Sequence, residues 1–215
     1  MKKKTKEQMR GGSIFGPSAY LYQRSYPTSV THNFYLYGPI EEFDDNVVDM
    51  ITTLDLATEN DIINIFVNTP GGALNVTISI VHAMMRSNAI VITHADGDVA
   101  SAGTLIFFAG QLHIVYPYSK FMFHDSSGGI DPYAKSNENF KMIQAGSELL
   151  RNMVYDLYCP VFTEAEVDTI MSGIDYYCLA DEMMDRLKAA FSDEEEQIEE
   201  VSDPKPKRTR KKKTD

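Results

Sequence analysis

The sequence of 215 residues contains no tryptophan, only two cysteines and no long apolar run. Cys159 and Cys178 are too few for a disulfide framework and lack the spacing of a metal site, so we expect unpaired thiols in a reducing compartment. No stretch approaches the roughly 18 apolar residues of a membrane-spanning helix. The basic N-terminus is not followed by an apolar segment, as a secretory signal requires. These absences favour a cytoplasmic protein without a membrane span.

Basic side chains are scarce between residues 11 and 191, where 22 acids face only 8 bases. A body this acidic is a poor ligand for nucleic acid. Residues 1–29 are basic and then rich in Gly, Pro and Tyr, which predicts a partly disordered arm. Residues 192–215 carry an acidic block and then a basic one, and their low hydrophobicity predicts a disordered tail. Residues 30–191 remain as one folded domain.

Strand-like and helix-like segments alternate along this domain, which predicts an α/β fold with a largely parallel sheet and right-handed crossovers. Short apolar runs bounded by Gly or Pro predict the strands, and apolar residues at a helical period predict the helices. The expected strands are residues 33–40, 61–68, 90–93, 112–116 and 120–124. The expected helices are residues 43–58, 75–86, 104–109, 137–158, 163–171 and 182–191.

A serine, Ser101, lies among small residues between a strand-like and a helix-like segment. A sharp strand-to-helix turn of this kind exposes a nucleophile, and the helix N-terminus favours negative charge beside it. Close packing or a helix N-cap explains the same pattern without chemistry. Asp98, three residues earlier, is expected to cap the turn.

Two further strands end in residues that suit acyl-transfer chemistry. The segment 61–68 runs into Pro70-Gly71-Gly72, and the segment 120–124 ends at His124, shortly before Gly128-Gly129. A serine, a glycine pair and a histidine at the ends of three strands would supply a nucleophile, backbone donors and a base. An ordinary turn remains the alternative for the glycine pair. His94 and His113, in or beside apolar strands, are expected to be packed histidines without a catalytic role.

Taken together, these stretches resemble the proteolytic subunit of the Clp protease, a family of self-compartmentalised serine peptidases. The resemblance runs from about Phe34 to Glu182 and implies the Clp/crotonase fold, an α/β spiral of parallel strand–helix repeats with helix 137–158 as a projecting handle. It places Ser101 as nucleophile, His124 as base and Asp175 as the acid that orients the histidine. Asp125 is the local alternative, but neighbouring residues of a strand point to opposite faces.

The resemblance also assigns the groups around the nucleophile. The backbone N–H groups of Gly72 and Ala102 would form the oxyanion hole. A substrate peptide would pair with an edge segment by strand addition. This substrate-binding set comprises Gly71, Ser126, Ser127, Gly128 and Gly129. No metal or cofactor is implied.

The function implied is hydrolysis of unfolded polypeptides inside a chamber of two stacked heptameric rings. An AAA+ unfoldase would spend the ATP, because the chain carries no Gly-x-x-x-x-Gly-Lys-Ser/Thr motif. Neither nucleic acid nor membrane is an expected partner. Three alternatives stay open: a viral-type maturation protease on the same fold, an inactive ring subunit, and a crotonase-like acyl-CoA enzyme.

The expected handle helix carries Phe140, Ile143, Leu149, Leu150 and Val154. A helix that projects into water would leave too much of this apolar surface exposed. We therefore expect it to pack against its counterparts from the opposite ring and to order the catalytic residues there.

Overall fold

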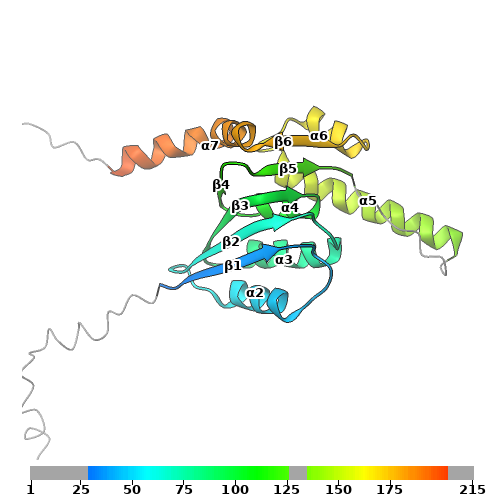
Figure 1. Ribbon diagram of the computed structural model, residues 1–215, viewed down its shortest axis with the longest axis horizontal. Helices are drawn as coiled ribbons and strands as arrows, with labels where there is room; N and C mark the ends of the chain where they lie inside the picture. Colours follow the sequence, from blue (N-terminus) through cyan, green and yellow to red (C-terminus); the bar gives the residue numbers. More distant parts are fainter. Residues whose placement is uncertain (1–28, 126–134, 203–215) are drawn as a thin grey trace, which may run out of the picture.

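The computed structural model describes residues 29–125 and 135–202. Within them, six strands form one sheet in the order β1-β2-β3-β5-β6, and β4 pairs with β3 beside this path (Figure 1). The strands are β1 (Thr31–Tyr37), β2 (Ile62–Thr69), β3 (Ile90–Ala100), β4 (Leu112–Val115), β5 (Lys120–Phe123) and β6 (Tyr176–Leu179). The sheet positions the predicted site residues, because β2, β3 and β5 end next to the glycine pair, Ser101 and His124.

The pairing is parallel from β1 through β5, and only β6 runs antiparallel to its neighbour β5. The first half of β3 pairs with β4 and the second half with β5. This strand is longer than the expected 90–93 because backbone pairing continues where the apolar pattern stops. The predicted α/β arrangement with a largely parallel sheet is confirmed.

Three helices cover one face of the sheet, as Figure 1 shows. They are α2 (Asp45–Leu56), α3 (Leu74–Arg86) and α4 (Ala102–Phe108). The Asp44 carboxylate caps α2 by accepting from the N–H of Val47 at 2.8 Å, and all seven residues of α4 are buried. The burial of α4 fixes the turn that precedes it, because a helix enclosed by the core has little freedom to rotate.

The remaining helices are α5 (Ser136–Tyr158), α6 (Glu164–Met171) and α7 (Ala180–Ser202). Figure 1 shows α5 projecting from the body, as the sequence predicts for a handle. Helix α7 continues through residues 192–202, where low hydrophobicity predicts a disordered tail. The run of glutamates there consists of good helix formers, which accounts for the difference. None of the helices in the described ranges is long and apolar enough to cross a bilayer.

The apolar residues of α5 divide into a buried group and an exposed group. Leu150 and Val154 are only 6% and 3% exposed and belong to the core. Phe140 and Leu149 are 69% and 52% exposed, although Leu149 adjoins Leu150 in the sequence. The expectation that all five apolar residues serve a ring contact is therefore wrong for Leu150 and Val154, because the base of the handle packs on the domain itself.

Candidate active site

The predicted site residues gather where parallel strands end. Gly71 and Gly72 follow β2, Ser101 follows β3, and His124 follows β5. Because these strands run in the same direction, their carboxyl ends meet at one edge of the sheet, where open α/β sheets bind ligands. Topology thus brings together residues that lie up to 53 positions apart in the sequence.

Ser101 occupies a sharp turn between β3 and α4. Its φ of 53° and ψ of −125° lie in a region that residues with side chains rarely adopt. Its N–H donates to the carbonyl of Met122 on β5 at 2.8 Å, and the helix begins at the next residue. Such a conformation persists only where surrounding contacts enforce it, and it is typical of functional turns.

The imidazole of His124 lies directly beside this serine. Its Nε2 is 2.6 Å from Ser101 Oγ, which is hydrogen-bond distance. With the proton on Nδ1, Nε2 accepts the serine proton, and this is the arrangement that a general base requires. The pair can therefore generate a nucleophilic oxygen at neutral pH.

The glycine pair closes the site from the β2 side. A Cβ on Gly71, whose φ is +93°, would lie 2.6 Å from Ser101 Cβ and 2.8 Å from the carbonyl oxygen of Ala100. Beside it, Ile40 donates its N–H to Gly71 and accepts from the N–H of Ala73. This bridge does not use the N–H of Gly72. The close approach of the two turns needs a residue without a side chain.

The second candidate oxyanion donor is the N–H of Ala102. Ala102 is the first residue of α4, and the N–H groups at the start of a helix have no acceptor within it. Ala102 and Gly72 both line the cavity that contains Ser101 and His124. Backbone donors from two turns thus border one space, as an oxyanion hole requires.

This cavity has a volume of about 670 Å³. One wall is formed by the glycine turn, the serine turn and His124, and the other by α5. The α5 side is mostly apolar and comprises Met142, Ile143, Gly146, Ser147, Leu150, Val154 and Tyr158. A volume of this size accommodates several side chains of an extended peptide.

Asp175, the predicted third member of the triad, is not hydrogen-bonded to His124 in the described residues. The β5–β6 ladder ends with Phe123 opposite Tyr176, and His124 and Asp175 each lie one position beyond this pair. Asp175 is exposed, and within the described ranges no hydrogen bond or ion pair joins it to His124. Asp125, the local alternative, lines the cavity.

The start of β6 is held by an arginine on α7. Arg186 donates to Tyr176 and to Glu166, both at 2.8 Å, and its guanidinium lies over the ring of Phe162. The hydrogen bond from Arg186 lowers the pKa of Glu166 to about 2. This ion pair ties α6 and α7 to the residue that follows Asp175, so it limits where that carboxylate can lie.

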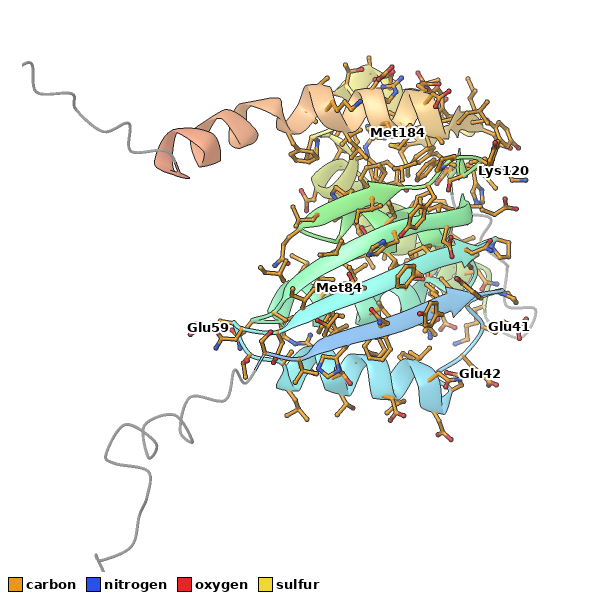
Figure 2. The ribbon with its side chains drawn as sticks, turned by 60° about the vertical axis from the view of Figure 1, so that its left-hand side comes forward. Glu41, Glu42, Glu59, Met84, Lys120 and Met184 are labelled. Atoms are coloured by element: carbon orange, nitrogen blue, oxygen red, sulfur yellow. The ribbon has the colours of Figure 1, made fainter. Side chains whose placement is uncertain are left out.

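The structure decides several other assignments. Asp98 does not cap the serine turn; it pairs with Lys120, labelled in Figure 2, with 3.2 Å between Oδ1 and Nζ. His94 stacks on Phe66, and His113 contacts Thr93 in the core, so both are packed histidines as predicted. Cys159 and Cys178 are unpaired. Ser126, Ser127, Gly128 and Gly129 lie outside the described residues.

Sequence reasoning missed two residues of the site, Thr104 and Tyr158. Their hydroxyls are 2.5 Å apart and lie beneath the serine turn. A polar residue in the otherwise apolar segment after Ser101 was the available signal for Thr104. Nothing local marks Tyr158, because it meets Thr104 only through the fold.

A serine hydroxyl at hydrogen-bond distance from a histidine, at a cavity bordered by two backbone N–H groups, is the arrangement typical of serine hydrolases. The profile of the Clp protease family matches residues 29–184. The chain therefore belongs to the Clp protease family.

Individual relatives agree with this assignment. The ATP-dependent Clp protease proteolytic subunit 3 of Rhizobium johnstonii is 30% identical over 160 residues, which are 72% of this chain and 80% of the relative. The protein of the same name from Rhizobium meliloti is 31% identical over 148 residues, 67% of this chain and 73% of the relative.

A solved structure is similar in fold. A point mutant of ClpP1 from Listeria monocytogenes superposes with a TM-score of 0.59 over 72% of this chain and 86% of its own, at 22% identity. The fold is thus the Clp/crotonase type that the sequence predicts.

Proposed function

We propose that this chain is a serine endopeptidase that cleaves unfolded polypeptides. The observation that supports it most directly is the 2.6 Å contact between His124 Nε2 and Ser101 Oγ, at a cavity bordered by two backbone donors. Membership of the Clp protease family supports this proposal. A crotonase-like acyl-CoA reaction needs no such serine–histidine pair, so the geometry favours peptide hydrolysis.

The proposed reaction follows from the positions of the groups. Ser101 Oγ attacks the carbonyl carbon of the substrate while His124 Nε2 takes its proton, and the N–H groups of Gly72 and Ala102 stabilise the oxyanion. The C–N bond then breaks, and His124 protonates the leaving amine. Water, deprotonated by His124, next attacks the acyl-serine and releases the second product, with the proton returning to Ser101.

We assign Asp175 as the residue that holds the histidine tautomer. Both residues lie one position beyond the last pair of the β5–β6 ladder, and a carboxylate opposite His124 would accept from Nδ1–H. Formation of this bond requires the exposed Asp175 carboxylate to move toward the half-buried His124. We propose that it forms when the protein assembles and the handle helices contact one another.

We further propose that the subunits form two heptameric rings stacked face to face. The exposed Phe140 and Leu149 of α5 support a contact between handles, because a group of exposed apolar side chains on one element often marks an interface. The substrate chain would pair with residues 126–129, where the family binds peptides by strand addition.

An AAA+ unfoldase is the proposed partner that delivers substrate. The relatives named above are ATP-dependent by name. In this chain Tyr35, Tyr37 and Tyr118 are exposed. Tyrosine is enriched at protein–protein interfaces, so these residues are candidates for the contact with the partner. We place the complex in the cytoplasm, in keeping with two unpaired cysteines.

A fluorophosphonate probe tests the function. The wild-type protein should be labelled at Ser101, and Ser101→Ala should lose both labelling and cleavage of a small fluorogenic peptide while it still assembles. Unlabelled wild-type protein in its assembled form would indicate an inactive ring subunit. Cleavage of the small peptide without an ATPase, together with failure of any unfoldase to stimulate degradation of unfolded protein, would favour the maturation protease.

A further inference from the structure

Two buried hydroxyls form a hydrogen-bonded chain beneath the serine turn. Thr104 Oγ1 lies 2.5 Å from the carbonyl oxygen of Ser101, and the hydroxyl of Tyr158 lies 2.5 Å from Thr104 Oγ1. Thr104 belongs to α4 and is fully buried, and Tyr158, at the C-terminal end of α5, is 4% exposed. The chain connects the handle helix to the backbone of the nucleophile.

The direction of the protons in this chain follows from chemistry. A carbonyl oxygen only accepts, so the single hydroxyl proton of Thr104 points to Ser101. Thr104 Oγ1 must then accept from Tyr158. Burial raises the pKa of Tyr158 well above its usual range, so the phenol keeps its proton. Every donor in the chain therefore has one defined acceptor.

The carbonyl that receives this proton shares a peptide unit with the N–H of Ala102. In a planar trans peptide the C=O and N–H point in opposite directions, and the structure holds no cis peptide in its described residues. Two donors hold the Ser101 carbonyl: the N–H of Thr104 at 2.9 Å and its hydroxyl at 2.5 Å. Both bonds pull the carbonyl toward α4, and the Ala102 N–H must then point away from the helix.

Strain makes this anchoring necessary. Ser101 has a φ of 53°, which costs free energy in any residue with a side chain. Without the hydroxyl of Thr104, only the N–H of Thr104 holds the Ser101 carbonyl against this strain, so the peptide after Ser101 is less firmly oriented. The aromatic rings of Phe108 and Phe123 pack on Tyr158 and fix the position of its hydroxyl.

We propose that Thr104 and Tyr158 are positioning residues that aim the Ala102 N–H at the oxyanion of the transition state. The inference rests on the proposed peptidase function. Neither residue touches the reacting atoms, and Tyr158 acts through Thr104. A donor oriented in this way binds the tetrahedral state better than the planar substrate, so its loss lowers kcat and leaves KM nearly unchanged.

The test compares Thr104→Val and Tyr158→Phe in the full-length, assembled protein. Thr104→Val removes a hydroxyl at constant shape, and we expect kcat to fall about 10- to 100-fold, less than or similar to the loss of a whole oxyanion donor. Tyr158→Phe should lower kcat about three- to tenfold. A peptide boronate, which forms a tetrahedral adduct with the serine, should lose affinity by the same factors, while a non-cleavable peptide binds as before.

Matched controls remove similar hydroxyls elsewhere. Thr93→Val deletes a buried hydroxyl that donates to the carbonyl of Phe107, and Tyr155→Phe deletes the phenol of α5 that donates to Asp168. Neither should change boronate affinity. Thr104→Ser should restore most of the activity lost in Thr104→Val. The double variant of Thr104→Val and Tyr158→Phe should be no slower than Thr104→Val alone, because the tyrosine acts through the threonine.

The outcomes separate this inference from the proposed function. If wild-type protein is not labelled by fluorophosphonate, the peptidase function fails. If wild-type protein is active and both variants match their controls in kcat and boronate affinity, the positioning role is overturned while the function stands. If Thr104→Val does not fold, Tyr158→Phe, which keeps the ring in place, decides the question alone.

Discussion

His124 and Asp175 each lie one position beyond Phe123–Tyr176, the last ladder pair of β5 and β6. Continuation of this register would set the two residues opposite each other on one face of the sheet, with Cβ atoms about 5 Å apart. No hydrogen bond or ion pair joins them in the described residues. Asp125 follows His124 along the chain and lines the same cavity.

This relationship predicts unequal effects of two matched substitutions. Asp175→Asn should lower kcat severely, because an amide cannot hold the productive tautomer of His124; serine proteases lose about 10⁴-fold on such a change. Asp125→Asn should reduce kcat less than about tenfold, because Asp125 is not the residue assigned to hold the His124 tautomer. Turnover of a fluorogenic peptide by the assembled variants measures both. The reverse order would identify Asp125 as the orienting residue.

The approach of Gly71 to the serine predicts a second pair of variants. Gly71→Ala should abolish peptide cleavage, because its Cβ would lie 2.6 Å from Ser101 Cβ and displace the serine turn. Gly173→Ala is the matched control, since Gly173 has nearly the same φ, +92° against +93°, and nothing within 4 Å of the added Cβ. Both changes strain the backbone equally. Only the first should lose fluorophosphonate labelling, and equal labelling in the two variants would contradict the contact.

The handle helix predicts a link between assembly and activity. Leu149→Glu or Phe140→Glu places a charge on exposed apolar surface and should give single rings or monomers that have lost peptidase activity together. Mass measurement in solution and a peptide assay report the two effects. Leu150→Glu does not test the contact, because Leu150 is buried in the domain and the charge would unfold it. A fully active monomer of Leu149→Glu would show that the handle has no such role.

A half-buried histidine away from the site, His113, predicts how stability depends on pH. Burial lowers the pKa of His113 to about 4, so the folded state holds it neutral while the unfolded chain protonates it near 6.5. The free energy of unfolding is therefore unaffected by His113 above pH 6.5. It falls as the pH drops from 6.5 towards 4, by about 3 kcal/mol in all, because the unfolded chain gains the proton first. The melting temperature of the wild type should fall as the pH is lowered through this range.

His113→Gln tests this assignment. The variant should lose less stability than the wild type between about pH 7 and pH 5, because its side chain takes up no proton. His82→Gln, which replaces an exposed histidine of α3, serves as the control and should follow the wild type. If the stability of His113→Gln and of the wild type fell equally with pH, this histidine would not have the role assigned to it.

Local pattern was sufficient to predict most of the fold. Apolar periodicity did not predict β6, but it placed the other strands and the helices of the described ranges within a few residues, with two exceptions at their ends. Strand β3 continues past residue 93 through a polar, glycine-containing stretch, because pairing with β2 and β5 satisfies its backbone. Helix α7 continues past residue 191, because the glutamates there favour the helical conformation although the segment has few apolar residues.

The sequence by itself determined which residues end the three parallel strands, because each strand and the motif at its end are local features. Parallel strands end at the same edge of a sheet, so Ser101, His124 and the glycine pair share one edge. Only the tertiary structure decided the 2.6 Å contact between His124 and Ser101, the burial of Leu150 against the exposure of Leu149, and the meeting of Thr104 with Tyr158. The first depends on the pairing of β3 with β5, and the other two depend on how α5 packs on the domain. Thr104 and Tyr158, 54 positions apart, carry no shared local signal. Packing between distant elements is set by the whole core, so no segment of the chain encodes it alone.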